Sequence, residues 1–204
     1  MFVSHVLGAV KSLCKCAILL DNSGFVKDGV ADTVMDYYSS VIARKQSDEN
    51  IQQLEGEDGG ISTRSGNGNA QITSVDITHD GGKTARTFLV GEEVVLRCCV
   101  TFNSKVHNPA VGILLRDRMG NDVYGTNTSH LGHKNMAVTV GESLDFAFSF
   151  PLNIGAGNYS VCVAVHGGDS HLEENCDWWD RCLALQMARG NKTSHVGVTC
   201  VQGE

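Results

Sequence analysis

Proline and long apolar runs are both scarce in this sequence. Only two of its 204 residues are proline, against 23 glycines, so we expect many turns and no proline-rich linker. No stretch approaches the ~20 consecutive apolar residues of a membrane-spanning helix. Basic residues are also in deficit, since 16 Lys and Arg face 23 Asp and Glu and leave a net charge of −7. This charge argues against nucleic acid or an anionic lipid surface as a direct partner.

A secretory signal peptide is not expected either. The first apolar run has no basic start, and Lys11 and Lys15 interrupt it. The eight cysteines therefore do not predict a disulfide framework. Cys98 and Cys99 are neighbours in an expected strand and must point to opposite faces, which suits buried free thiols. We predict a reduced, cytoplasmic protein.

What the sequence does have is a long series of alternating apolar and polar residues from Ala70 onward. In Leu144–Phe150 every second residue is apolar, and Val94–Phe102 and Tyr159–His166 alternate in the same way. About eight or nine short strands with no helical period are typical of two packed antiparallel sheets. We predict a mainly β protein, with residues 70–204 forming an Ig-like or jelly-roll β-sandwich.

The first 69 residues have a different composition. Residues 1–45 indicate a short α/β segment, with a helix over Leu7–Leu13, a strand over Ala17–Leu20 and a second helix from Asp32 or Thr33 to about Lys45. These elements are too few to enclose a core, so their apolar faces need a partner. Residues 46–69 are acidic and then rich in Gly and Asn, which predicts a flexible linker.

A hairpin over Ile113–Thr128 carries the first candidate site. Met119–Asp122 supply a tight turn, and the returning strand places Tyr124, Asn127 and Thr128 within five residues. An aromatic ring covers the apolar face of a sugar, and an amide both donates to and accepts from hydroxyls. The alternative is a polar hairpin that satisfies only its own backbone.

The segment Asp177–Asp180 carries two neighbouring tryptophans. If it is extended, Trp178 and Trp179 point to opposite faces, so one belongs to the core and the other is a stacking platform for a sugar ring. Asp177 supplies a carboxylate beside them. The pattern leaves open which ring is exposed.

Arg116 and His166 lie opposite the core-facing positions of their strands and border one open sheet face in this interpretation. For Arg116, pairing with Asp117 or Asp122 is an equal alternative, and His166 can instead cap a loop.

Metal and hydrolase sites are weakly supported. His130 with His133, and His166 with His171, lack Cys or carboxylate partners at a ligand spacing, so no metal is expected. A glycosidase needs two carboxylates facing a cleft, and nothing indicates that Asp177 and Asp180 face one another. We therefore expect a binding module and not an enzyme.

The segment FVSHVLGAVKSLCKCAILLDNSGFVKDG, followed by DTVMDYY, resembles the C-terminal end of an ABC-transporter ATPase domain. The resemblance implies that His5 is the switch (H-loop) histidine that contacts the γ-phosphate of ATP. No G-x-x-x-x-G-K-[ST] loop is present, because the residue five before Gly82-Lys83-Thr84 is Ile77. This chain alone is expected to bind no cofactor, and ATP and Mg²⁺ belong to a full-length parent.

The remaining motifs are PAVGILLRDRMGNDVYGTNT, FSFPLNIGAGNYSVCVAVHGG and DWWD. Together they resemble the C-terminal domain of the Wzt-type ATPase subunit of O-antigen polysaccharide exporters. The resemblance implies a glycan-recognition module at the inner membrane, a homodimer and a channel-forming transmembrane partner. The apolar run Val196–Val201 can pair across such a dimer. The alternative is a structural sandwich that dimerises or docks the ATPase and binds no glycan.

Overall fold

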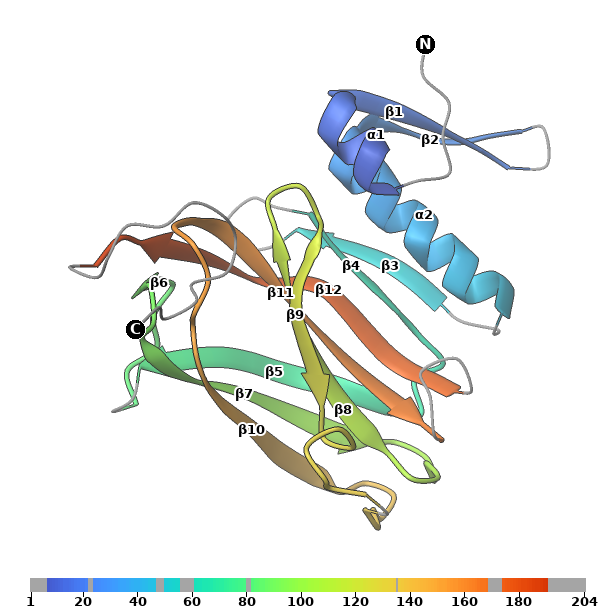
Figure 1. Cartoon of the computed structure of the whole chain (residues 1–204). Coiled ribbons are helices and arrows are strands. Elements are labelled where there is room, and N and C mark those ends of the chain that lie inside the picture. Colours follow the sequence, from blue (N-terminus) through green and yellow to red (C-terminus); the bar gives the residue numbers. More distant parts are fainter. Residues whose placement is uncertain are drawn as a thin grey trace.

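The computed structural model describes residues 7–21, 24–46, 50–55, 61–79, 82–134, 136–168 and 174–190 (Figure 1). The elements are α1 (Leu7–Leu13), β1 (Cys16–Asp21), β2 (Gly24–Val30), α2 (Ala31–Gln46), β3 (Asn50–Glu55), β4 (Ile61–Gly66), β5 (Ala70–His79), β6 (Thr87–Leu89), β7 (Glu93–Phe102), β8 (Ala110–Asp117), β9 (Asp122–Asn127), β10 (Ser143–Pro151), β11 (Gly157–Gly167) and β12 (Glu174–Ala188).

Two sheets pack face to face and enclose the main core, as predicted for a β-sandwich. The smaller sheet has the order β10-β7-β5, and the larger sheet has the order β3-β4-β12-β11-β8-β9. The short β6 pairs in parallel with the end of β12. All other neighbouring strands in both sheets are antiparallel.

The alternating pattern of the sequence produces this core. In β7 the side chains of Val94, Leu96, Cys98, Val100 and Phe102 are all buried between the sheets. Their counterparts on the larger sheet include Val111, Ile113 and Leu115 of β8 and Val161, Val163 and Val165 of β11. Because successive strand residues point to opposite faces, the residues between them form the outer face of the larger sheet. That outer face is where we look for the site.

The first elements form a small layer at one end of the larger sheet (Figure 1). The β1–β2 hairpin and α1 pack on α2, around a second core of Val10, Leu19, Ala31, Val34 and Met35. This agrees with the elements expected for residues 1–45. We call residues 7–46 the front layer below.

The front layer leaves an apolar surface exposed. Ile18, Leu20, Phe25 and Val30 of the hairpin are each more than 60% exposed, and Leu13 at the end of α1 is 72% exposed. Leu20 and Phe25 are paired across the hairpin, so their side chains form one patch. The described residues thus contain nothing that covers this face.

The linker predicted for residues 46–69 requires a correction. β3 and β4 lie inside this range, and β4 pairs directly with β12. The residues of β4 are polar because both faces of this strand pack against other parts of the chain. Arg64 turns inward against Trp179, while Thr63 and Ser65 are buried on the other face, where α2 packs against β3 and β4. A polar strand of this kind has no apolar alternation and looks like a linker in sequence.

Neither helix in the part of the chain that the structure describes has the length and apolar character needed to cross a bilayer. The described cysteines are all free thiols. His5, His171 and the run Val196–Val201, which the sequence analysis singled out, lie outside the described residues.

Candidate functional site: the outer face of the larger sheet

One cross-strand row defines the middle of the outer face. Ser65, Trp178, Ala164, Gly112 and Asn127 are paired in turn across β4, β12, β11, β8 and β9. Directly paired residues point to the same face of a sheet. The adjacent row includes the core residues Val163 and Ile113, so the row with Trp178 faces outward.

Within the row, Trp178 and Asn127 have the larger side chains, and the residues between them are small. Trp178 is half-buried beside Ser65, whose side α2 covers. Gly112 and Ala164 contribute almost no side chain, and a Cβ at Gly112 would lie 3.4 Å from the Cβ of Asn127. Trp178 and Asn127 are three strands apart, which corresponds to roughly 14 Å at the usual strand spacing. The indole and the amide therefore lie on one face of the sheet, and only Gly112 and Ala164 lie between them in this row, which we call the strip.

Asn127 keeps a hydrogen-bond donor for this strip. Its Oδ1 accepts from the backbone N–H of His130 at 2.7 Å, which fixes the side chain at the end of β9. Among the described residues its Nδ2 group has no hydrogen-bond partner. The amide is thus held in place on one side and available on the other.

Thr128 is placed as the alternative reading of the hairpin requires. It is buried, its Oγ1 accepts from the N–H of Val111 at 3.1 Å, and its own N–H donates to the Val111 carbonyl at 2.9 Å. The side chain extends the pairing of β9 with β8. Thr128 therefore contributes to the strip only by fixing the end of the strand that carries Asn127.

Tyr124 lies on the other side of the sheet from Asn127. It is paired with the core residue Leu115, and its ring centroid is 5.6 Å from that of Phe150 on β10. The ring is 42% exposed at the open edge between the two sheets. The structure therefore does not bring Tyr124 and Asn127 together.

Arg116 also lies on the outer face, four residues along β8 from Gly112, where it lines the pocket near the front layer. Its Nε donates to Asp122 Oδ1 at 2.8 Å and its Nη1 to Asp180 Oδ1 at 2.7 Å. Burial opposes the charge of the guanidinium, but the two carboxylates outweigh it, and the pKa of Arg116 is raised. The thiol of Cys162 donates to the same oxygen of Asp180 at 2.6 Å, and burial raises the pKa of that thiol. Of the two carboxylates that the sequence analysis considered as partners of Arg116, Asp122 is the one that binds it.

Asp177 and Trp179 turn inward and join the two sheets. Arg64 donates to both carboxylate oxygens of Asp177, and the backbone N–H of Ile72 on β5 donates to Asp177 Oδ2 at 2.7 Å. The guanidinium of Arg64 also lies 4.7 Å from the ring centroid of Trp179. Trp178 is consequently the outward ring, which the sequence left open.

His166 shares the outer face but is buried at the end of β11, opposite Ala110. It interacts with other residues of the chain and does not border an open surface. Within the described ranges no three metal-ligating side chains gather, and His130 and His133 lie in an exposed turn.

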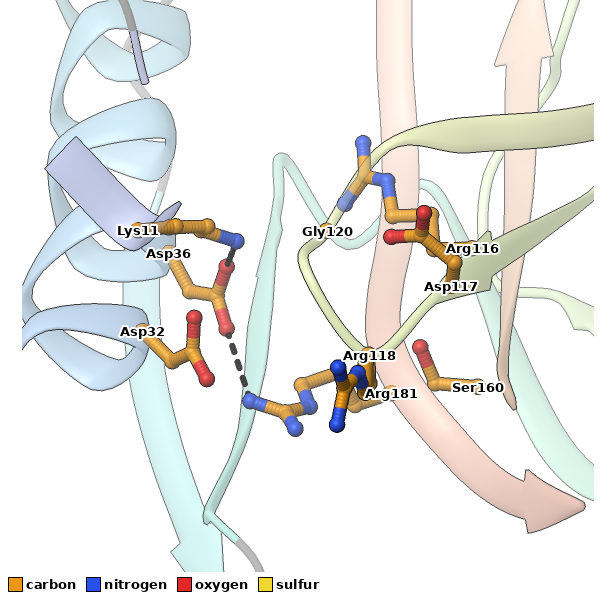
Figure 2. Close-up of a pocket in the computed structure, with 9 residues that line it drawn as sticks. All are labelled: Lys11, Asp32, Asp36, Arg116, Asp117, Arg118, Gly120, Ser160 and Arg181. Atoms are coloured by element: carbon orange, nitrogen blue, oxygen red, sulfur yellow. Dashed lines mark hydrogen bonds and ion pairs between the residues drawn. The ribbon is translucent and has the colours of Figure 1, made fainter. Parts of the chain in front are cut away.

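A polar pocket lies where the front layer meets the sheet (Figure 2). Its walls come from α1, α2, the end of β8, the β8–β9 turn, β11 and β12. Asp36 of α2 lies between Lys11 Nζ at 2.6 Å and Arg181 Nη1 at 3.5 Å. The sequence analysis missed this cluster, because no local pattern connects residues so far apart in the chain.

The comparisons with known proteins agree with this fold. Residues 61–201 match the family model described as the Wzt C-terminal domain, and the match begins with β4. The crystal structure of the C-terminal domain of Wzt is similar with a TM-score of 0.64 and 19% identity, over 80% of this chain and 93% of that one. Among curated proteins, none matches this sequence.

A Niemann-Pick type C2 protein from the Japanese carpenter ant is also similar, with a TM-score of 0.44 and 8% identity, over 58% of this chain and 92% of that one. At this TM-score the likeness carries no argument about function.

Proposed function

The chain belongs to the Wzt C-terminal domain family, as the C-terminal part of a Wzt-type ABC-transporter ATPase subunit, and we propose that it recognises the polysaccharide to be exported. The family's domain is non-catalytic. Recognition of an O-antigen glycan, and the outer face as its site, are our proposal.

The observation that carries the proposal is the row from Trp178 to Asn127. An indole ring stacks on the apolar C–H face of a pyranose, and the free amide Nδ2 of Asn127 donates to a ring hydroxyl. Gly112 and Ala164 let the sugar approach the backbone between them. Arg116 and Asp122 lie further along the same face of β8 and β9, where a longer glycan would meet a further polar pair.

Affinity for a single glycan end should be modest. Sugar hydroxyls exchange hydrogen bonds with water for similar ones with the protein, so each bond contributes about 1 kcal/mol. The remaining predicted site residues have supporting parts in this proposal. Asp177 and Trp179 fix the strand that carries Trp178, while Thr128 and His166 fix the strand ends.

The deciding experiment compares two aromatic residues on opposite sides of the sheet. The 204-residue chain is titrated with the cognate polysaccharide in a calorimeter, as wild type, Trp178→Ala and Tyr124→Ala. We expect Trp178→Ala to weaken binding about tenfold or more, because a stacked ring is worth roughly 1.4 kcal/mol. Tyr124→Ala removes a more exposed ring at the sheet edge and should have little effect.

Three other outcomes have clear meanings. Loss of binding with Tyr124→Ala alone would move the site to the edge between the sheets. Saturable binding that neither change affects would show that our site is wrong. No saturable binding by the wild-type chain would favour the alternative function, a sandwich that only dimerises or docks.

The front layer fits a docking role toward the ATPase body. Its exposed patch around Leu20 and Phe25 has no cover among the described residues, as expected if residues 1–45 are the end of an ATPase domain. We propose that the preceding part of that domain covers it, that ATP and Mg²⁺ bind there, and that His5 then acts as the switch histidine. The same proposal includes a homodimer, and a channel-forming partner that holds the subunit on the cytoplasmic side of the inner membrane.

A further inference from the structure

β12 is interrupted by a bulge next to the outer face. Trp179 pairs with Val163 and Leu183 pairs with Val161, so three residues of β12, Asp180 to Cys182, lie opposite the single residue Cys162. Arg181 has a φ of 54°, in the left-handed region. A residue with a side chain pays a conformational cost there, and bulges commonly redirect a side chain. The left-handed backbone conformation of Arg181 therefore requires a structural explanation.

The bulge sends two neighbouring, opposite charges to two different partners. Asp180 stays on the outer face and binds Arg116 and Cys162. In a regular strand Arg181 would then point into the core, where an unpaired guanidinium is very costly. The bulge instead brings its Nη1 to 3.5 Å from Asp36 Oδ2 on α2.

Asp36 is the centre of this contact. Its side chain is only 4% exposed, and Lys11 of α1 binds its other oxygen at 2.6 Å (Figure 2). A carboxylate so well buried needs its cations, and one of the two comes from the sandwich. The front layer and the sandwich are therefore joined by charge as well as by packing.

A second contact places α1 against the β8–β9 turn. Gly120 has a φ of 79°, and a Cβ at this position would lie 2.7 Å from Lys11 Nζ. A Cβ on Gly8 of α1 would lie 3.4 Å from Asn121 Oδ1. The turn is thus shaped to accept α1, on the same side of the molecule as the bulge.

We propose that the bulge at Asp180–Cys182 is a docking element, which fixes the front layer on the sandwich through Arg181 and Asp36. The strain at Arg181 is retained because it serves this contact and not the sheet itself. Asp180 of the bulge also binds Arg116, so the docking contact lies on the same outer face as the proposed glycan strip. Only this last link depends on the proposed function; the docking does not.

Hydrogen–deuterium exchange on the full chain tests the proposal, with Arg181→Gly as the main variant. Glycine is relaxed at a positive φ, so the variant removes the cation and the strain together. We expect α2 amides to exchange roughly three to ten times faster, the range for loss of a partly buried ion pair. Amides of β11 and β12 should exchange at the wild-type rate or more slowly.

Two further variants complete the test. Arg118→Ala removes an exposed cation that lines the same pocket without binding Asp36, and should change neither set of amides. Adding Arg181→Gly to Asp36→Asn should accelerate α2 exchange no further than Asp36→Asn alone.

Unchanged α2 exchange in Arg181→Gly would overturn the proposal. A joint rise in α2, β11 and β12 would also overturn it, since the bulge would then stabilise the sheet itself. Neither readout involves polysaccharide, so a failure of glycan binding leaves this result unaffected.

Discussion

At the scale of single residues, the carboxylate of Asp177 holds the two sheets together at the end of β12. Both of its oxygens are bound, by Arg64 and by the backbone of Ile72, and its side chain is only 6% exposed. Removing one partner of a buried ion pair leaves the other charge uncompensated. Arg64 would then lie buried over Trp179 without its counter-ion.

We predict that Asp177→Ala lowers the free energy of unfolding by about 3 kcal/mol, measured by urea denaturation. The matched control is Asp76→Ala, whose partner Arg86 is 3.7 Å away and about as exposed as Asp76 itself. That change should cost less than about 1 kcal/mol. Equal losses in the two variants would contradict the role assigned to Asp177.

The orientation of the site side chains could be predicted from the sequence only in part. The two tryptophans do face opposite sides, as their adjacency requires, but the choice of Trp178 depends on the register with β11 and β4. Tyr124 and Asn127 are three residues apart in one strand, and such residues point to opposite faces. Their proximity in sequence suggested one cluster, but their odd separation along the strand places the two side chains on opposite faces of the sheet.

At the scale of elements, β4 belongs to the sandwich and is not part of a linker. It pairs with β12 along Trp178 to Asp180 and supplies Arg64 to the intersheet contact. The larger sheet therefore reaches back to β3, and its pairing with β12 begins with β4 at residue 61 and not at residue 70. This boundary agrees with the start of the family match.

We predict that a fragment of residues 61–204 unfolds cooperatively, whereas residues 70–204 is markedly less stable or unfolded. Without β4, the edge of β12 is bare and Asp177 loses Arg64. Thermal unfolding followed by circular dichroism would measure the difference. Identical melting temperatures for both fragments would restore the linker interpretation.

The exposed hairpin of the front layer gives a second prediction at this scale. Leu20 and Phe25 form an apolar patch that attracts other apolar surfaces. We expect the double variant Leu20→Lys/Phe25→Lys to reduce self-association of the chain in analytical ultracentrifugation, with little loss of stability. The control Leu131→Lys/Val140→Lys changes two residues that are similarly exposed on loops of the sandwich and should not reduce it.

Most strands were predictable because the main sandwich alternates buried and exposed residues. This holds for β7, β8 and β11, in which every second residue reaches the core. The failures occurred where both faces of an element are covered by polar contacts. In β4 the packing of α2 and the Arg64 contacts replace apolar alternation, and no local pattern signals such long-range pairing.

At the scale of the whole molecule, the outer face of the larger sheet is divided between two uses. The front layer lies against β3 and β4 and reaches the bulge of β12, whereas the strip from Trp178 to Asn127 extends across β12, β11, β8 and β9. We propose that the strip from Trp178 to Asn127 binds the glycan.

The most direct test is a backbone amide NMR titration of the isotope-labelled chain with the cognate polysaccharide. Our account predicts saturable shifts that centre on Gly112, Ala164 and Asn127 and on the indole N–H of Trp178. Amides around Tyr124 and Phe150 should shift little, since they lie at the edge between the sheets. Shifts confined to that edge, or no saturable shifts at all, would contradict the claim that this face recognises the polysaccharide.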